Sequence, residues 1–111
     1  MTENNIFVSY SSRDVEFAKA LAEELERLGS TVWIDQHGID LGTNWDSSID
    51  DALDTATTLL LLISKPAASS ENVQDEVHIA KEYKKKIIPI LIEQCVKFYN
   101  YFVINVIAFK I

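Results

Sequence analysis

The sequence contains few of the residues that define several common classes of protein. Cysteine occurs once, as Cys95, so no disulfide can form within the chain, and a small scaffold held together by disulfides is excluded. A lone thiol suits a reducing compartment. The first five residues lack the basic and then apolar pattern of a secretory signal. We therefore expect a cytoplasmic protein.

Long apolar runs are also missing. The most apolar stretch, residues 96–111, is interrupted by Lys97, Asn100, Asn105 and Lys110. It falls short of the ~20 apolar residues that cross a bilayer. No membrane partner is expected, and this stretch is predicted to form a connection followed by a buried strand.

Basic residues are scarce, with 10 against 17 acidic residues and a formal net charge of −7 at pH 7. Because this charge repels phosphate backbones, it disfavours nucleic acid as a direct partner. The one basic run, Lys84 to Lys86, is predicted to form the last turn of a helix. His37 and His78 are far apart in the sequence and have no cysteine or histidine nearby at ligand spacing. No metal site and no cofactor are therefore expected.

Several motifs of nucleotide and acyl chemistry are absent. The chain has no Gly-x-Gly-x-x-Gly, no Walker lysine loop and no Gly-x-Ser-x-Gly elbow. These absences exclude dinucleotide oxidoreductases, phosphate-loop NTPases and α/β-hydrolases. A phospho-acceptor receiver domain would need acidic residues after its first strand and an aspartate at the end of its third. This chain has Ser-Tyr-Ser-Ser at residues 9–12 and Ile63 and Ser64 at the second place, so a receiver domain is excluded.

Short apolar runs alternate with amphipathic segments along the chain. The clearest helix is predicted to begin at Val15, after a capping box from Ser11 to Asp14, and to end at Gly29. A second helix is capped by Thr43 or Asn44, and a third, which carries Val73, Glu76, Val77, Ala80 and Tyr83 at helical spacing, by Ser69 or Ser70. Strands are predicted over residues 6–9, 31–34, 59–63, 87–92 and 103–109.

This alternation predicts one fold class. Strands separated by helices at this spacing require right-handed crossovers and a parallel sheet. We expect an α/β, doubly wound, flavodoxin-like fold with a five-stranded parallel sheet and helices on both faces. Residues 1–111 are expected to form a single domain. No final helix covers the last predicted strand, so either that helix is missing from this fragment or something else covers the strand. The sequence leaves open whether a sensor domain follows.

The carboxyl ends of the predicted strands carry the polar residues most suited to a ligand. In open parallel sheets the ligand crevice lies beyond these ends, where the strand order reverses. Residues 9–12, 35–42 and 64–70 and Glu93 occupy them. Glu76 belongs to the third helix and sits on or beside its apolar stripe.

Six sequence motifs occur together in a recognisable order. They are Ile6-Phe7-Val8-Ser9-Tyr10-Ser11-Ser12-Arg13-Asp14, Val32-Trp33-Ile34-Asp35, Gly42-x-x-Trp45, Leu61-Leu62-Ile63-Ser64, Val73-x-x-Glu76 and Ile88-Pro89-Ile90. In this order the chain resembles a Toll/interleukin-1 receptor (TIR) domain of the prokaryotic, NAD-cleaving branch. The resemblance runs from residue 6 to about residue 92 and continues loosely to residue 109.

The resemblance implies an activity and a set of site residues. TIR domains include enzymes that split NAD into nicotinamide and ADP-ribose or a cyclic form, with NAD as the substrate and not as a cofactor. The position that matches their catalytic glutamate is Glu76. The matching substrate-binding positions are Tyr10, Ser11, Ser12, Asp40 and Trp45. The resemblance also implies self-association with other TIR domains and a role in antiviral defence or stress signalling.

The chemistry of NAD cleavage explains why a carboxylate is needed. Positive charge grows on the ribose as neutral nicotinamide leaves, and a fixed carboxylate stabilises such an oxocarbenium-like state. One departure favours a different function, because Asn72 stands where many catalytic members have tryptophan. Aromatic stacking would then fall to Tyr10, Trp33 or Trp45. The alternative is a non-enzymatic scaffold that docks through residues 35–42.

Overall fold

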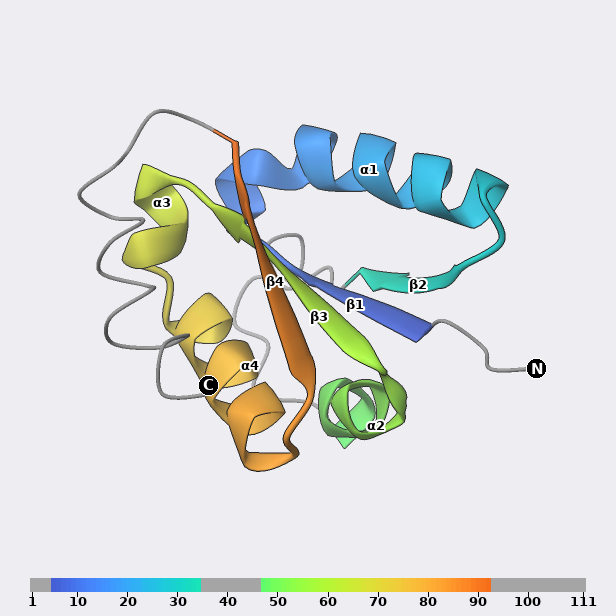
Figure 1. The fold of residues 1–111 in the computed structure, drawn as a ribbon. Coiled ribbons are helices and arrows are strands. Elements are labelled where there is room, and N and C mark those ends of the chain that lie inside the picture. Colours follow the sequence, from blue (N-terminus) through green and yellow to red (C-terminus); the bar gives the residue numbers. More distant parts are fainter. Residues whose placement is uncertain (1–4, 35–46, 93–111) are drawn as a thin grey trace.

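The computed structural model describes residues 5–34 and 47–92 of the chain. Their elements are β1 (Asn5–Ser9), a 3-10 turn η1 (Ser12–Asp14), α1 (Val15–Arg27), β2 (Thr31–Ile34), α2 (Ser47–Thr55), β3 (Thr58–Ile63), α3 (Lys65–Ala68), α4 (Glu71–Glu82) and β4 (Lys86–Leu91). These strands form a parallel sheet in the order β2-β1-β3-β4 (Figure 1). The predicted fifth strand, over residues 103–109, lies outside the described residues.

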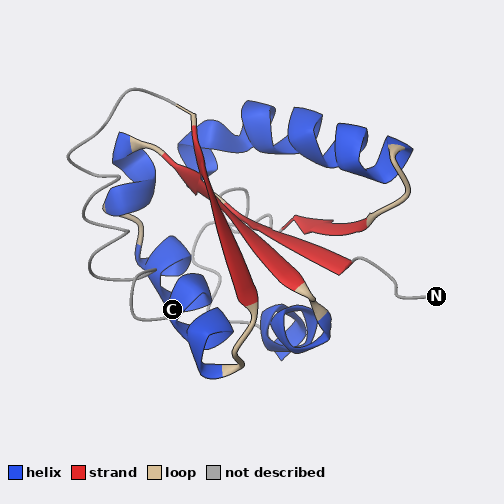
Figure 2. Cartoon of the chain, in the orientation of Figure 1, coloured by secondary structure: helices blue, strands red, loops and turns tan. Residues whose placement is uncertain are grey.

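Helices cover both faces of the sheet. Helix α1 lies on one face, and α2 and α4 lie on the other (Figure 2). On the α2 and α4 face, Phe7, Leu59 and Leu61 pack against Leu53 and Val77. On the α1 face, the cluster contains Val8, Tyr10, Ala18, Leu60 and Leu62. The chain therefore has the predicted doubly wound, flavodoxin-like α/β fold.

The centre of this sheet is β3, as the sequence predicts. This strand pairs with β1 on one side and β4 on the other, and its residues Leu59 to Ile63 are all buried. A strand covered on both faces needs apolar side chains pointing both ways, which explains the unbroken run Leu-Leu-Leu-Leu-Ile.

Helices α1 and α4 end in the same hydrogen-bonded motif. After α1, the Ser30 N–H donates to the carbonyl of Leu25, and after α4 the Lys85 N–H donates to the carbonyl of Ala80. This pattern places one residue in a left-handed conformation. Gly29 occupies that position after α1 with φ +103°, and Lys84 occupies it after α4 with φ 58°.

The structure corrects three local predictions. The run Lys84 to Lys86 does not form the last turn of a helix, because α4 ends at Glu82 and Lys86 begins β4. Between β3 and α4 no helix was predicted, but the segment contains α3, which has Pro66 in its first turn. The predicted capping box from Ser11 to Asp14 does not form. The Asp14 carboxylate accepts a hydrogen bond from Ser64 instead, and Ser11 Oγ accepts one from the Arg13 N–H.

Two predicted helix starts have different outcomes. Ser70 caps α4, since its Oγ accepts a hydrogen bond from the Val73 N–H at 3.3 Å. The predicted caps of the preceding helix, Thr43 and Asn44, lie outside the described residues. In α2 itself Ile49 and Leu53 are buried, and so is Ala56 directly after the helix.

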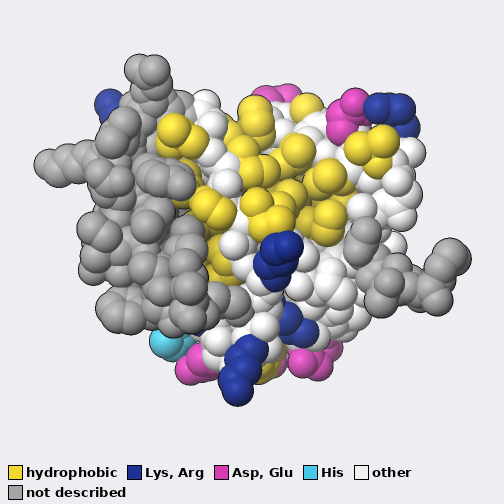
Figure 3. Space-filling view, viewed as in Figure 1, with side chains coloured by type: hydrophobic (Ala, Val, Ile, Leu, Met, Phe, Trp, Pro, Cys, Tyr) yellow, Lys and Arg dark blue, Asp and Glu magenta, His cyan; other side chains and the backbone are white. Residues whose placement is uncertain are grey.

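The α1 face of the sheet is only partly covered beside β4. Ile88, which shares the α1 face with Ile90, is 37% exposed. Leu91, the last residue of β4, lies on the other face and is 45% exposed. Figure 3 shows hydrophobic side chains gathered over this side of the molecule. In the described part of the chain, no helix has both the length and the apolar character needed to cross a membrane.

Candidate functional site

The strand order places a ligand crevice between β1 and β3. The chain leaves β1 toward α1 and β2 on one side, while β3 continues the sheet on the other side. Such a reversal point opens a crevice at the carboxyl ends of the two strands. In this molecule the crevice is bordered by residues 10–14 after β1 and by Ser64 and α3 after β3.

Glu76 reaches this edge from α4. It lies at helical spacing with Val73, Val77 and Ala80, and all four side chains are buried. The Glu76 Oε1 atom accepts a hydrogen bond of 2.7 Å from Ser9 Oγ, and Ser9 is the last residue of β1. The carboxylate is therefore directed at the carboxyl end of β1 and away from the solvent-exposed side of α4.

The burial of Glu76 has an energetic consequence. Its side chain is 0% exposed, and a buried carboxylate loses the hydration that stabilises its charge. A hydrogen bond from a hydroxyl compensates part of that cost. Because most helix positions facing a core are apolar, a carboxylate at this position signals a requirement beyond packing.

The sequence analysis placed Ser9 at this edge of the sheet but did not pair it with Glu76. Along β1, Phe7 and Ser9 point toward α4, while Val8 and Tyr10 point toward α1. This follows from the two-residue period of a strand. A hydroxyl at the α4-facing position next to Phe7 was the available signal, since it replaces an apolar side chain in a buried row.

Tyr10 is not brought beside Glu76. It is 1% exposed and belongs to the cluster with Val8, Ala18 and Leu62 on the α1 face. Ser9, by contrast, bonds Glu76 on the other face. The structure thus places Tyr10 in the core, and its predicted contact with substrate stays a prediction.

Ser11 and Ser12 border an open polar cavity of about 520 Å³. Its other lining residues are Arg13 from η1, Lys65 and Pro66 from α3, and Ser69 and Ser70 before α4. Glu76 is not among them, so the buried carboxylate and this cavity are separate features of the same sheet edge.

A short hydrogen bond joins the two segments that border the crevice. Ser64 Oγ donates to Asp14 Oδ2 at 2.5 Å and accepts from the Ala67 N–H at 3.2 Å. Ser64 follows β3 and Asp14 ends η1, so the bond links the chain after β3 to the chain after β1. It fixes the spacing of the two walls of the crevice.

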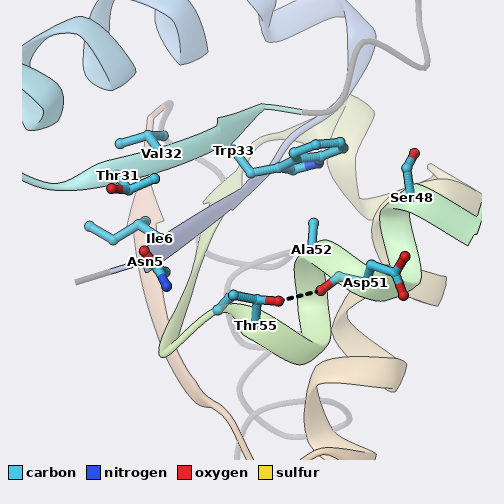
Figure 4. Close-up of a pocket in the computed structure, with 10 residues that line it drawn as sticks. Asn5, Ile6, Thr31, Val32, Trp33, Ser48, Asp51, Ala52 and Thr55 are labelled. Carbon is cyan, nitrogen blue, oxygen red and sulfur yellow. Dashed lines mark hydrogen bonds between the residues drawn. The ribbon is translucent and has the colours of Figure 1, made fainter. Parts of the chain in front are cut away.

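A second cavity, of about 410 Å³, lies between β2 and α2 (Figure 4). The Trp33 ring forms one wall and Ser48 and Asp51 lie opposite it. Trp33 also stacks on Phe7, with ring centroids 6.4 Å apart. Trp33 is one of the rings considered for stacking on the substrate, whereas Tyr10, Ser11 and Ser12 are not among the described residues that line this cavity. Asp40 and Trp45, both predicted to bind substrate, lie outside the described residues.

Metal chemistry has no support in residues 5–34 and 47–92. Within these two ranges, no three His, Cys, Asp or Glu side chains are grouped so as to hold a metal ion. His78 lies on the exposed side of α4, where its Nε2 is 3.3 Å from Glu82 Oε1. The chemistry of the edge is that of a carboxylate, hydroxyls and two cationic side chains.

A parallel sheet with this strand order and helices on both faces defines a doubly wound α/β domain. The TIR domain family model matches residues 6–108. The chain belongs to the TIR domain family.

Two relatives with assigned activities are similar in sequence. The NAD(+) hydrolase TcpA of Theionarchaea archaeon (strain DG-70-1) is 33% identical over 93 residues, which are 79% of this chain and 28% of that protein. The 2′ cyclic ADP-D-ribose synthase AbTIR of Acinetobacter baumannii (strain 1295743) is 30% identical over 93 residues, 79% of this chain and 35% of that protein. The chain thus spans about a third of the length of these relatives.

Solved TIR structures share the fold at lower identity. The TIR domains of the activated Roq1 resistosome superpose with a TM-score of 0.75 at 18% identity, over 90% of this chain and 64% of that chain. The TIR domain of the Toll-related receptor TRR-2 from Hydra magnipapillata gives a TM-score of 0.69 at 22% identity, over 83% of this chain and 73% of that chain.

Proposed function

We propose that this protein is an NAD+ glycohydrolase in which Glu76 is the catalytic residue. One observation carries the proposal: a buried carboxylate on α4 is held by Ser9 at the carboxyl end of β1, where the strand order reverses. The names of the relatives TcpA and AbTIR, an NAD(+) hydrolase and a cyclic ADP-ribose synthase, support it.

The proposed reaction breaks the bond between nicotinamide and the ribose. The bonding electrons leave with nicotinamide, which departs as a neutral molecule, and positive charge develops on the sugar. The Glu76 carboxylate stabilises that charge. Attack by water then yields ADP-ribose and a proton, whereas attack by a nucleophile within the same ADP-ribose yields a cyclic product.

Ser9 is a positioning residue in this proposal. Its hydroxyl donates to Oε1 and so holds the Glu76 carboxylate at the carboxyl end of β1. Because Glu76 is 0% exposed, substrate reaches it only when the edge opens. Self-association with other TIR domains is a means of opening this edge. The consumption of NAD would in turn give the protein a role in cytoplasmic defence or stress signalling.

The first prediction tests the charge of Glu76. Glu76→Gln keeps the size of the side chain and an oxygen that accepts from Ser9, but removes the negative charge. We expect nicotinamide release from NAD to fall by about 10² to 10³-fold, the usual cost of losing one electrostatic stabiliser of a transition state. The assay follows nicotinamide by chromatography, with and without a crowding agent that promotes assembly.

Asp75→Asn is the matched control. Asp75 is the preceding residue of α4 and is exposed, so the variant makes the same change in net charge outside the core. We expect it to retain the wild-type rate. Equal rates for wild type and Glu76→Gln would contradict the proposed role.

The second candidate function is a non-enzymatic TIR interaction module. It is favoured by Asn72, which is exposed in the first turn of α4 and offers no aromatic ring to a nicotinamide. This function predicts no nicotinamide release at any protein concentration, together with binding to another TIR domain that is lost when residues 35–42 are replaced.

A further inference from the structure

The cavity between β2 and α2 has an aromatic wall and an acidic wall. It has a volume of about 410 Å³ and extends from Asn5 and Thr31, the first residues of β1 and β2, to α2. Ser9 lies at the opposite end of β1, about 13 Å from Asn5 in an extended strand. The cavity is therefore separate from the Ser9–Glu76 pair and from the chemistry proposed for it.

The Trp33 ring is held in place at the wall of this cavity. It stacks on Phe7, with ring centroids 6.4 Å apart and an angle of 20° between the ring planes. Phe7 is fully buried, whereas Trp33 is 37% exposed. A ring that the protein already holds in one orientation loses little further freedom when a ligand contacts it, and this favours binding.

Asp51 lies opposite the ring, on α2 (Figure 4). Its backbone carbonyl accepts a hydrogen bond of 2.9 Å from Thr55 Oγ1, but its carboxylate forms no ion pair with the residues that the structure describes. The preceding Asp50 is turned toward the end of α4, where it accepts a hydrogen bond from Tyr83. The Asp51 carboxylate can therefore pair with a ligand in the cavity.

The charge around the cavity favours a cation. Helix α2 contains three aspartates and no lysine or arginine in residues 47–55, and the chain as a whole carries a net charge of −7. The face of an aromatic ring also attracts positive charge, and tryptophan does so more strongly than tyrosine or phenylalanine. Both walls of the cavity thus attract ligands of the same sign.

We propose that this cavity binds a small organic ammonium ion, with Asp51 as the counter-ion and the Trp33 ring as the surface on which the ion rests. The remaining wall includes apolar side chains that alkyl groups of such an ion can contact, namely Ile6, Val32, Ala52 and Ala56. A Ca²⁺ or Mg²⁺ ion would instead need several oxygen ligands. The volume lies within the usual ~300 to 1,000 Å³ of small-molecule sites.

Choline is the probe, because it is a small ammonium ion with methyl groups. The full chain is titrated with choline chloride to about 10 mM, which detects dissociation constants in the millimolar range, while NMR follows the indole N–H of Trp33. The Trp33→Phe variant identifies this signal by its loss. We expect a shift that saturates with choline and does not occur with sodium chloride at the same concentration.

A neutral isostere separates the charge from the shape of the probe. Choline in which carbon replaces the nitrogen has the same size but no charge, and it should bind about 5-fold or more weakly, because it loses both the ring and the carboxylate as electrostatic partners. Equal binding of the two molecules would show an apolar pocket without preference for a cation, and would overturn the proposal.

Asp51→Asn tests the counter-ion and should weaken choline binding by about 3-fold or more, the size expected for an exposed ion pair. Asp54→Asn is the matched control. It makes the same change of charge in the same helix, and Asp54 is not among the described residues that line the cavity. This variant should bind choline as the wild type does.

Two further results would overturn the ammonium site. One is the absence of a saturable shift of the Trp33 indole signal in the wild type, and the other is an equal loss of affinity in Asp51→Asn and Asp54→Asn. The site does not depend on NAD cleavage, so Glu76→Gln should bind choline with the affinity of the wild type. A protein that binds choline but releases no nicotinamide would support this site and contradict the enzymatic proposal.

Discussion

At the scale of single residues, the Ser9–Glu76 pair is the least expected contact in the core. Both side chains are 0% exposed, and their 2.7 Å hydrogen bond joins positions 67 residues apart. A carboxylate buried among Val73, Val77 and Ala80 costs free energy that an apolar residue would not. Natural sequences retain such strain at sites where it serves a function.

A second prediction concerns the stability of this pair. Ser9→Ala leaves the buried carboxylate without its hydroxyl donor and should lower the free energy of unfolding by about 1.5 to 3 kcal/mol. In a Glu76→Gln background the same change should cost less, about 1 kcal/mol, because a neutral amide needs less compensation. Urea denaturation of the four proteins completes the double-mutant cycle, and additive losses would refute the coupling.

A third prediction concerns Gly29 and Lys84, where substitutions should change the stability of the fold in opposite directions. Both have positive φ after a helix, at +103° and 58°, and only glycine adopts this region without cost. Nothing lies within 4 Å of a Cβ added at Gly29, so Gly29→Ala tests the backbone alone.

Gly29→Ala should lower the stability by about 1 kcal/mol, and Lys84→Gly should raise it by about 0.5 kcal/mol. The smaller gain at Lys84 reflects the greater freedom that glycine has in the unfolded chain. Thermal unfolding followed by circular dichroism measures both. A stabilised Gly29→Ala variant would contradict the assigned backbone conformation.

At the scale of elements, side chains join α2 to the end of α4. Tyr83 donates a hydrogen bond of 2.8 Å to Asp50 Oδ1, and Lys85 Nζ donates to the Asp54 carbonyl at 2.6 Å. The hydrogen bond to Asp50 raises the pKa of Tyr83 above its ordinary value. Desolvation and the negative charges of Asp50, Asp54 and Glu82 act in the same direction and are smaller.

The fourth prediction follows from the sign of that shift. Because the folded pKa of Tyr83 is higher than the unfolded one, its contribution to stability is fully present below about pH 10 and is lost as the pH rises through the folded value. Urea denaturation between about pH 8 and pH 11 should show a steeper loss for wild type than for Tyr83→Phe. Parallel pH profiles would show that the bond does not form in solution.

Some elements were predictable because their signals are local. The buried strand β3 follows from five consecutive apolar residues, and α1 follows from apolar positions at helical spacing that end at Gly29. The end of α4 was not predictable in this way, because Lys84 takes the left-handed position without being glycine. Helix α3 was missed although Ser64 and Pro66 are an ordinary start signal.

The candidate site was predictable only in part, for a similar reason. Glu76 stands out as an acid within an apolar helical stripe, so its inward direction could be anticipated. The hydroxyl of Ser9 is visible in the sequence, but its pairing with Glu76 could not be anticipated, because the pair depends on which face of β1 meets α4. Tyr10 shows the same limit, since a motif places it near the substrate while the strand period turns it toward α1.

At the scale of the whole molecule, the fold brings separate chemistries to one edge of the sheet. The buried carboxylate of Glu76 and the polar cavity beside Ser11 and Ser12 both lie at the carboxyl ends of β1 and β3. The Ser64–Asp14 bond holds these ends together. Ile88 and Ile90 of β4 lie on the α1 face and are therefore separated by the sheet from Glu76 on the α4 face.

The most direct test of this account is the rate at which the purified protein releases nicotinamide from NAD, measured side by side for wild type and Glu76→Gln. The account predicts measurable release by the wild type and a loss of about 10² to 10³-fold in the variant, with unfolding free energies that agree within about 1 kcal/mol. Release at the same rate by both folded proteins would contradict the catalytic role of Glu76.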